Sequence, residues 1–337
     1  MLVIAALAAG IGLLAMRWRD SGFQWDLFGQ SLISVRWPWL WASYILILLT
    51  YYGRVLRWEV MIRPICPRPN HWRLLSATLI GFTALVLLGR AGELVRPYLI
   101  AKKEGLPVSS QMAAWLLERI YDILIVLLAF GFALTQVPAR VVDSPHLQYL
   151  LDFGGRFVFV LAILCLAVLV MMRWFADTAQ RRIGDAMVAL PEPYRTRLAT
   201  VLNAFLEGVQ STRSLRSTSL LLLYTLLEWL LIAGCYLCLF QSFPATAWCG
   251  WRDVMCFLGF VSVGSIVQIP GVGGGMQVVG VIVLTELLHV PLEAAAGVSL
   301  MIWLMTFVAV VPIGTLLAFR EGLNWRKLKT LKDQVPS

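Results

Sequence analysis

Long apolar stretches separated by short polar segments dominate the chain. A helix that crosses a bilayer needs about 20 mostly apolar residues. The stretches that meet or nearly meet this length are 1–16, 37–57, 109–135, 153–173, 217–241 and 293–319. Trp or Tyr stands at several of their ends, as expected where a span meets the membrane surface. The pattern predicts an all-α polytopic membrane protein with about six spanning helices, built as a single transmembrane domain over 1–337.

Two further apolar stretches, 74–100 and 252–288, are interrupted near their middles by glycine, proline or charge. Lys and Arg indicate how they lie, because cytoplasmic loops are enriched in these residues. The basic groups between the apolar stretches are Arg54, Arg57, Arg63, Arg68 and Arg73; Lys102 and Lys103; seven arginines between 173 and 216; and five residues from Arg320 to Lys332. All can be cytoplasmic only if 74–100 is a re-entrant hairpin from the cytoplasmic side and 252–288 one from the outer side.

This topology divides the chain into two halves of opposite orientation. The first, 1–135, has three crossings and the cytoplasmic hairpin, and the second, 153–320, has three crossings and the external hairpin. Inverted repeats with broken helices are an architecture of secondary transporters. The segment 174–213 is expected to be a cytoplasmic amphipathic connection. The alternative is a plain bundle of eight spans, which would leave one basic group outside.

Composition supports the membrane interpretation. The chain is 59% hydrophobic and 14% charged, whereas soluble domains carry about 25% charged residues. The net charge is +9, and the basic residues lie mostly between the apolar spans, so they indicate membrane topology and not nucleic-acid binding. The N-terminal run has no basic segment before it and no small-residue cleavage site after it, and is therefore expected to be a retained span.

Ionisable residues inside the apolar stretches are the candidate functional groups, because each costs about 2.5–3.5 kcal/mol to insert. The run Gly89–Pro97 contains Arg90, Glu93 and Arg96 at intervals of three. On a helix these side chains share one face, so the Glu93 carboxylate is expected to hold both guanidinium groups. Arginine presents a planar fork of donors that suits a phosphodiester. The alternative is a purely structural ion-pair network.

A second charged group lies on the third predicted span. Glu118 and Asp122 are one helical turn apart and face together, while Arg119 lies about 100° around the helix. Glu228 adds a carboxylate in the middle of the span 217–241. With Arg90, Glu93 and Arg96 these groups carry three positive and four negative charges, so we expect them to pair in a shared cavity.

The third feature is the run IPGVGGGMQ at 269–277, at the tip of the external hairpin. Its glycines, Gly273 and Gly274 among them, prevent a continuous helix. A helix that restarts near Met276 would direct unpaired N–H groups into the cavity and favour a phosphate. The run lacks the Lys-Ser/Thr of a nucleotide-binding loop, so ATP binding is not expected.

Three segments, GRAGELVRPYLIAKKEG, LLERIYD and IPGVGGGMQ, resemble the transmembrane family of lysylphosphatidylglycerol synthases, also called flippase-like. The resemblance covers essentially the whole chain and implies that Arg90, Glu93, Arg96, Glu118, Arg119 and Asp122 are motif positions. It also implies transfer of aminoacylated phosphatidylglycerol or polyprenyl-linked lipids between leaflets. The family often has Glu where this chain has Gln277, so proton coupling at that position is not expected here. We expect this chain to lack the soluble aminoacyl-transferase domain that some members carry.

We therefore expect a flippase in a bacterial inner membrane, with both termini cytoplasmic. Its partner is a membrane phospholipid or glycolipid, and the pattern leaves open a homo-oligomer and a separate lipid synthase. Protease and esterase motifs are absent from the sequence, and we expect no enzymatic activity, metal or cofactor. The alternatives are an intramembrane lipid-modifying enzyme with Glu118 or Asp122 as general base, and a lipid-binding partner of a separate synthase.

Overall fold

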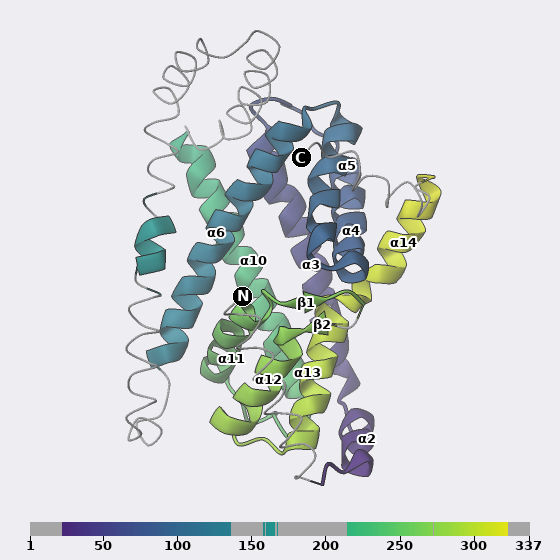
Figure 1. The fold of residues 1–337 in the computed structure, drawn as a ribbon, viewed down its shortest axis with the longest axis vertical. Coiled ribbons are helices and arrows are strands. Elements are labelled where there is room, and N and C mark those ends of the chain that lie inside the picture. The colour runs from purple at the N-terminus through teal and green to yellow at the C-terminus, as the bar shows by residue number, and fades with distance from the viewer. Residues whose placement is uncertain are drawn as a thin grey trace.

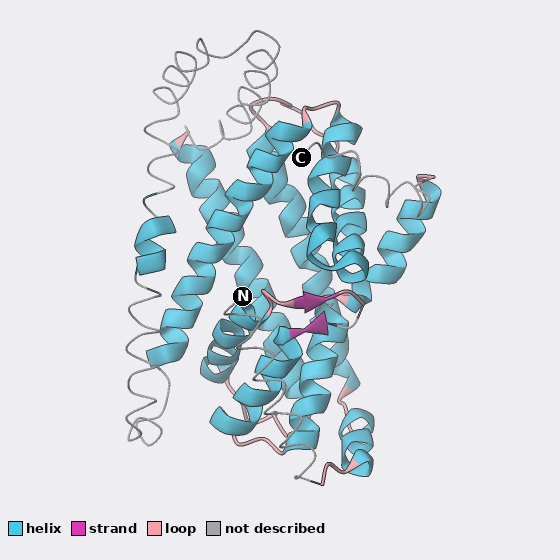
Figure 2. Ribbon diagram, in the orientation of Figure 1, coloured by secondary structure: helices cyan, strands magenta, loops and turns pink. Residues whose placement is uncertain are grey.

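The structure is a computed structural model that describes residues 22–135, 158, 160–165, 167, 214–271 and 273–322. The predicted span 1–16, most of the predicted span 153–173 and the predicted connection 174–213 lie outside these residues. Within the described residues the chain is mostly helical, with one short two-stranded sheet near the middle of the molecule (Figure 2).

The described elements follow the apolar stretches of the sequence. In chain order they are α2 (Trp25–Ile33), α3 (Trp37–Ile62), α4 (His71–Leu88), the 3₁₀ turn η1 (Gly89–Leu94), α5 (Val95–Glu104), α6 (Val108–Thr135), α10 (Leu215–Ser242), α11 (Trp251–Gly264), β1 (Gln268–Ile269), β2 (Gly273–Gly274), α12 (Gly275–Ile282), the π-turn η3 (Val283–Leu287), α13 (Leu292–Thr306), η4 (Val308–Val310) and α14 (Val311–Arg320). Figure 1 shows their arrangement.

Four described stretches are long and apolar enough to cross a membrane: Trp37–Ile62, His71–Glu104, Arg216–Ser242 and Leu292–Arg320. Three of them coincide with the predicted spans 37–57, 217–241 and 293–319. The predicted span 109–135 is one helix, α6, but it carries three charged residues and is not among the four. The structure thus has the apolar helices of a membrane protein.

The stretch His71–Glu104 is a helical hairpin and not one straight rod. Asn70 caps the start of α4, where its side chain accepts hydrogen bonds from two backbone N–H groups. Gly89, with a φ of +67°, lets the chain turn at the end of α4. α5 then returns along α4, so closely that a Cβ on Gly81 would lie 2.5 Å from the Cβ of Arg96. Both outer ends of the pair therefore lie at the same end of the molecule (Figure 1).

The stretch 252–288 forms a second helical hairpin. α11 leads into the paired strands, in which Gln268 lies opposite Gly274 and Ile269 opposite Gly273. α12 then returns along α11. Gly264 and Gly275 make this possible, because a Cβ on Gly264 would lie 2.7 Å from the carbonyl oxygen of Gly275.

The tips of the two hairpins contact each other near the middle of the molecule (Figure 1). The Gly271 N–H donates to the Val86 carbonyl over 2.8 Å, and Pro270 packs against Gly89. The arginine at the first tip, Arg90, reaches past these residues to the end of α11. The contact joins segments about 180 residues apart in the chain and places them beside α3, α6 and α10.

Candidate functional site

Arg57 is the centre of a buried ion-pair network. It lies on α3 and its side chain is fully buried. Nη1 lies 2.6 Å from Asp122 Oδ1, and Nη2 binds Glu118 and lies 3.3 Å from Asp122 Oδ2. The prediction that Arg54 and Arg57 belong to a basic loop was wrong. α3 continues to Ile62, so both residues are helical and point into the bundle.

The carboxylates come from two helices that face α3. Glu118 and Asp122 share one face of α6, as their spacing predicts, and both contact Arg57. Glu228, on α10, is also buried, and its Oε1 lies 2.6 Å from Arg54 Nη2. Its Oε2 lies 3.4 Å from Arg57 Nη1. Three helices are therefore joined through charged groups inside an apolar bundle.

Arg96 joins the α4–α5 hairpin to this network. Its Nη1 lies 3.0 Å from Glu118 Oε2, and its Nη2 donates to the Arg54 carbonyl over 3.2 Å. The guanidinium stacks on the ring of Trp58, with its central carbon 4.3 Å from the ring centroid. The expectation that Glu93 holds Arg96 was wrong. The 3₁₀ turn η1 precedes α5, so Glu93 and Arg96 do not share a face of one regular helix.

Arg90 and Glu93 pair with each other at the hairpin tip. The remaining donors of Arg90 bind the second hairpin: Nη2 lies 2.6 Å from the Ser265 carbonyl oxygen and Nε lies 3.1 Å from that of Ile266. These carbonyls lie at the C-terminal end of α11, where the helix dipole favours a cation. Arg90 thus links the two tips.

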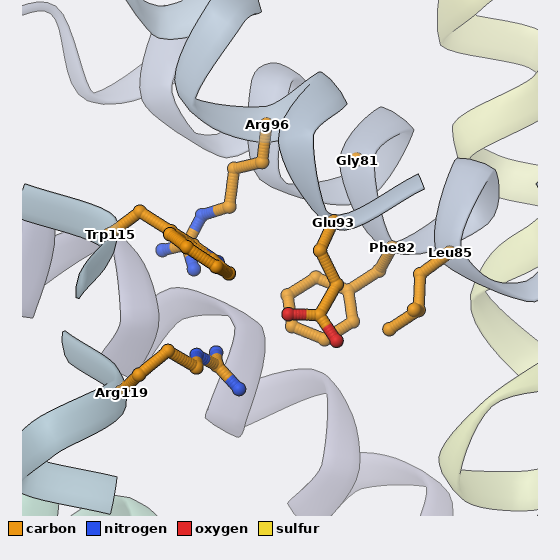
Figure 3. A pocket seen from close by; sticks show the side chains of 7 residues that line it. All are labelled: Gly81, Phe82, Leu85, Glu93, Arg96, Trp115 and Arg119. Carbon is orange, nitrogen blue, oxygen red and sulfur yellow. The ribbon is translucent and has the colours of Figure 1, made fainter. Parts of the chain in front are cut away.

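Arg119 and Glu93 line a small pocket between the first hairpin and α6 (Figure 3). The pocket is lined by Gly81, Phe82, Leu85, Glu93, Arg96, Trp115 and Arg119. Figure 3 shows the Arg119 guanidinium and the Glu93 carboxylate extending into the same space, beside the rings of Trp115 and Phe82. The pocket has a volume of about 40 Å³, which is room for on the order of three water molecules.

The glycine-rich tip is organised by its own hydrogen bonds. α12 begins at Gly275, within one residue of the predicted restart near Met276. The Gly275 N–H donates to the Val267 carbonyl over 2.9 Å, and the Gly274 N–H donates to Gln277 Oε1 over 2.6 Å. Gly273 and Gly274 have φ values of +103° and +140°, which favour glycine. Gln277 therefore acts as a cap of its own helix.

The network contains more cations than the sequence indicated. Its members are Arg54, Arg57, Arg90, Arg96 and Arg119 with Glu93, Glu118, Asp122 and Glu228. Five guanidinium groups face four carboxylates, an excess of one positive charge. Among the described residues no cluster of His, Cys, Asp or Glu has a composition and geometry suited to a metal ion. Charge pairing and anion binding are the chemistry that this arrangement supports.

Comparison with known proteins identifies the family of the chain. The family described as the lysylphosphatidylglycerol synthase TM region matches residues 3–314. The match covers the nine charged residues of the network. A search of curated proteins found no match.

Proposed function

Because the chain belongs to the transmembrane family of lysylphosphatidylglycerol synthases, whose role is related to membrane lipids, we propose that it is a lipid flippase. In this proposal a phosphate-containing head group crosses between leaflets through the charged interior while its acyl chains stay in the bilayer. The head group is that of an aminoacylated phosphatidylglycerol, another phospholipid or a polyprenyl-linked lipid. The protein acts without chemical change to the lipid, in a bacterial inner membrane.

The observation that supports this function is the cost of the network. Nine ionisable groups lie among apolar helices, and burial of a charge is costly unless the charge is paired. Fold stability does not require them, because a buried ion pair is often no more stabilising than apolar residues of similar volume. A polar path for a lipid head group would explain why the chain carries these charged side chains. The pocket at the edge of the network, which contains Glu93 and Arg119, is its entrance.

The two hairpins supply the moving parts in this proposal. We take the α4–α5 pair to be re-entrant from the cytoplasmic side and the α11–α12 pair from the outer side, as inverted halves. The pocket holds on the order of three water molecules, too few for a whole head group. Transfer therefore requires the first hairpin to move away from α6, and the Arg90 contacts to Ser265 and Ile266 to break.

Leaflet exchange of fluorescent phospholipids in proteoliposomes tests the proposal. Glu93→Gln and Arg96→Gln each remove a charge that contacts the pocket, and we expect exchange to slow by at least about tenfold. Glu59→Gln is the matched control, because Glu59 pairs with Arg63, whose side chain is 56% exposed, outside the pocket. Wild-type rates in both folded pocket variants would exclude the site. Recovery of a chemically altered lipid would favour the enzyme instead.

A further inference from the structure

Among the residues that the structure describes, Arg119 is the guanidinium of the network that forms no hydrogen bond. Its closest carboxylate oxygens, Asp122 Oδ2 and Glu118 Oε2, lie 3.5 and 3.7 Å from Nη2. Both distances exceed those of N–H···O hydrogen bonds in proteins, 2.7–3.2 Å. Its Nε is buried and has no hydrogen-bond partner in the described part of the chain. A guanidinium has five N–H donors, so Arg119 retains the capacity to bind an anion.

The other four guanidinium groups are occupied through their terminal nitrogens. Arg54 binds Glu228 and Arg57 binds Glu118 and Asp122. Arg90 binds Glu93 and two backbone carbonyls, and Arg96 binds Glu118 and the Arg54 carbonyl. Among the described residues the Nε of Arg54, Arg57 and Arg96 also lacks a partner, but each of these side chains has at least one Nη nitrogen paired with a carboxylate. Arg119 is therefore the cation best able to accept a new ligand.

The position of Arg119 makes it reachable. Its side chain is 31% exposed, whereas those of Arg57 and Arg96 are 0% and 5% exposed. It extends into the pocket from α6, next to Trp115 (Figure 3). The two unesterified oxygens of a phosphodiester fit the planar fork of a guanidinium. The pocket has room for these oxygens in place of water.

The charge count selects the class of lipid. The network has one more guanidinium than carboxylates, and an uncompensated charge is costly in a medium of low dielectric constant. One phosphodiester anion restores neutrality, whereas a dianion reverses the excess. A head-group amine would need a carboxylate, but Glu93, the acidic residue of the pocket, is already paired with Arg90. The pocket therefore favours a monoanion without an amine.

We propose that Arg119 binds the phosphodiester of a lipid with one net negative charge and no head-group amine. The inference rests on the proposed function only in taking the pocket to be the place where a head group binds. It narrows the substrate to lipids with a monoanionic phosphodiester, such as unmodified anionic phospholipids or polyprenyl-linked lipids with a single diester phosphate, and excludes aminoacylated and zwitterionic ones.

Native mass spectrometry of the full chain tests the selectivity. The detergent-purified protein is mixed with equal amounts of phosphatidylglycerol, phosphatidylethanolamine and phosphatidic acid. Phosphatidylglycerol carries one negative charge, phosphatidylethanolamine has no net charge, and phosphatidic acid has a phosphate monoester. We expect the wild type to retain phosphatidylglycerol at least about tenfold more than either competitor. Arg119→Gln removes the preference, whereas Arg119→Lys retains the charge and the preference but binds several-fold more weakly. Arg63→Gln makes the same change of charge outside the pocket and leaves the preference intact.

The outcomes separate this inference from the proposed function. Equal retention of the three lipids by the wild type, or an unchanged preference in Arg119→Gln, overturns the inference. Should Arg119→Gln not fold, unchanged affinity in Arg119→Lys overturns it as well. If leaflet exchange occurs but does not depend on head-group charge, the proposed flippase function is retained and the proposed lipid specificity is rejected. If the protein shows the expected lipid selectivity but no leaflet exchange, the proposed binding site is retained and the proposed flippase function is rejected.

Discussion

Replacement of Arg57 by Met should destabilise the protein, because it leaves one buried carboxylate, that of Asp122, without a close partner. Without Arg57, Glu118 keeps Arg96 at 3.0 Å and Glu228 keeps Arg54 at 2.6 Å. Asp122 keeps only longer contacts, with Arg119 at 3.5 Å and the Trp229 indole N–H at 3.4 Å. Loss of one partner from a buried pair costs about 3–5 kcal/mol. We expect the free energy of unfolding of Arg57→Met to fall by that amount.

A double-mutant cycle tests this explanation. Asp122→Asn removes the charge that Arg57→Met leaves unpaired, so the double variant should be about 1.5–3 kcal/mol more stable than the sum of the two single effects. Denaturant titration in mixed micelles measures the free energy of unfolding. Arg63→Met, at an exposed position, is the control and should change it by less than about 0.5 kcal/mol. Additive effects at Arg57 and Asp122, or a loss at Arg57 no larger than at Arg63, would refute the reasoning.

Two further changes test the hairpins. Arg90→Gln removes the guanidinium donors that bind the Ser265 and Ile266 carbonyls. The Gly271 amide, which donates to the Val86 carbonyl, should then exchange its hydrogen at least about tenfold faster. Exchange as slow as in the wild type would mean that Arg90 does not hold the tips together. Gly92→Ala places a methyl group on the backbone of Ala84 and should lower the free energy of unfolding by about 1–3 kcal/mol or more, whereas Gly29→Ala, where nothing lies within 4 Å, should not lower it.

Local pattern was sufficient to predict the helices and their interruptions. The glycines at 89 and 92 and those at 271–275 indicated where the chain turns, and the structure turns there. The spacing of Glu118 and Asp122 indicated a shared face, and both carboxylates contact Arg57. These features depend on residues within one or two helical turns, which is the range over which a single sequence is informative.

The centre of the site was missed because its partners are distant in the chain. Arg54 and Arg57 follow an apolar run, as loop arginines do, and their pairing depends on residues 61 to 174 positions away. The available signal was their spacing of three, which places both on one helix face. Arg96 was assigned to Glu93, three residues before it, yet it binds Glu118 on another helix. Periodicity identifies which side chains share a face but not which helix that face meets.

Gln277 shows the same limit for a backbone contact. The amide was interpreted from the sequence as the loss of a proton carrier. In the structure its Oε1 accepts a hydrogen bond from the Gly274 N–H, which is an end-of-helix role that either an amide or a carboxylate can fill. A role in holding the turn therefore accounts for this position without any proton transfer.

The position of the network along the bundle has a consequence for the proposed transport. Exposed tryptophans, Trp37, Trp39 and Trp41, lie at the start of α3, and exposed tryptophans belong at a membrane surface. At 1.5 Å per residue, Arg57 lies about 27 Å further along α3 than Trp39, close to the full thickness of a hydrocarbon core of about 30 Å. In the proposed topology the network and its pocket therefore lie in the leaflet at the basic end. The joined tips lie between this pocket and the tryptophan-rich end, so in the proposed flippase we expect the contacts of Arg90, which links the tips, to break before a head group passes.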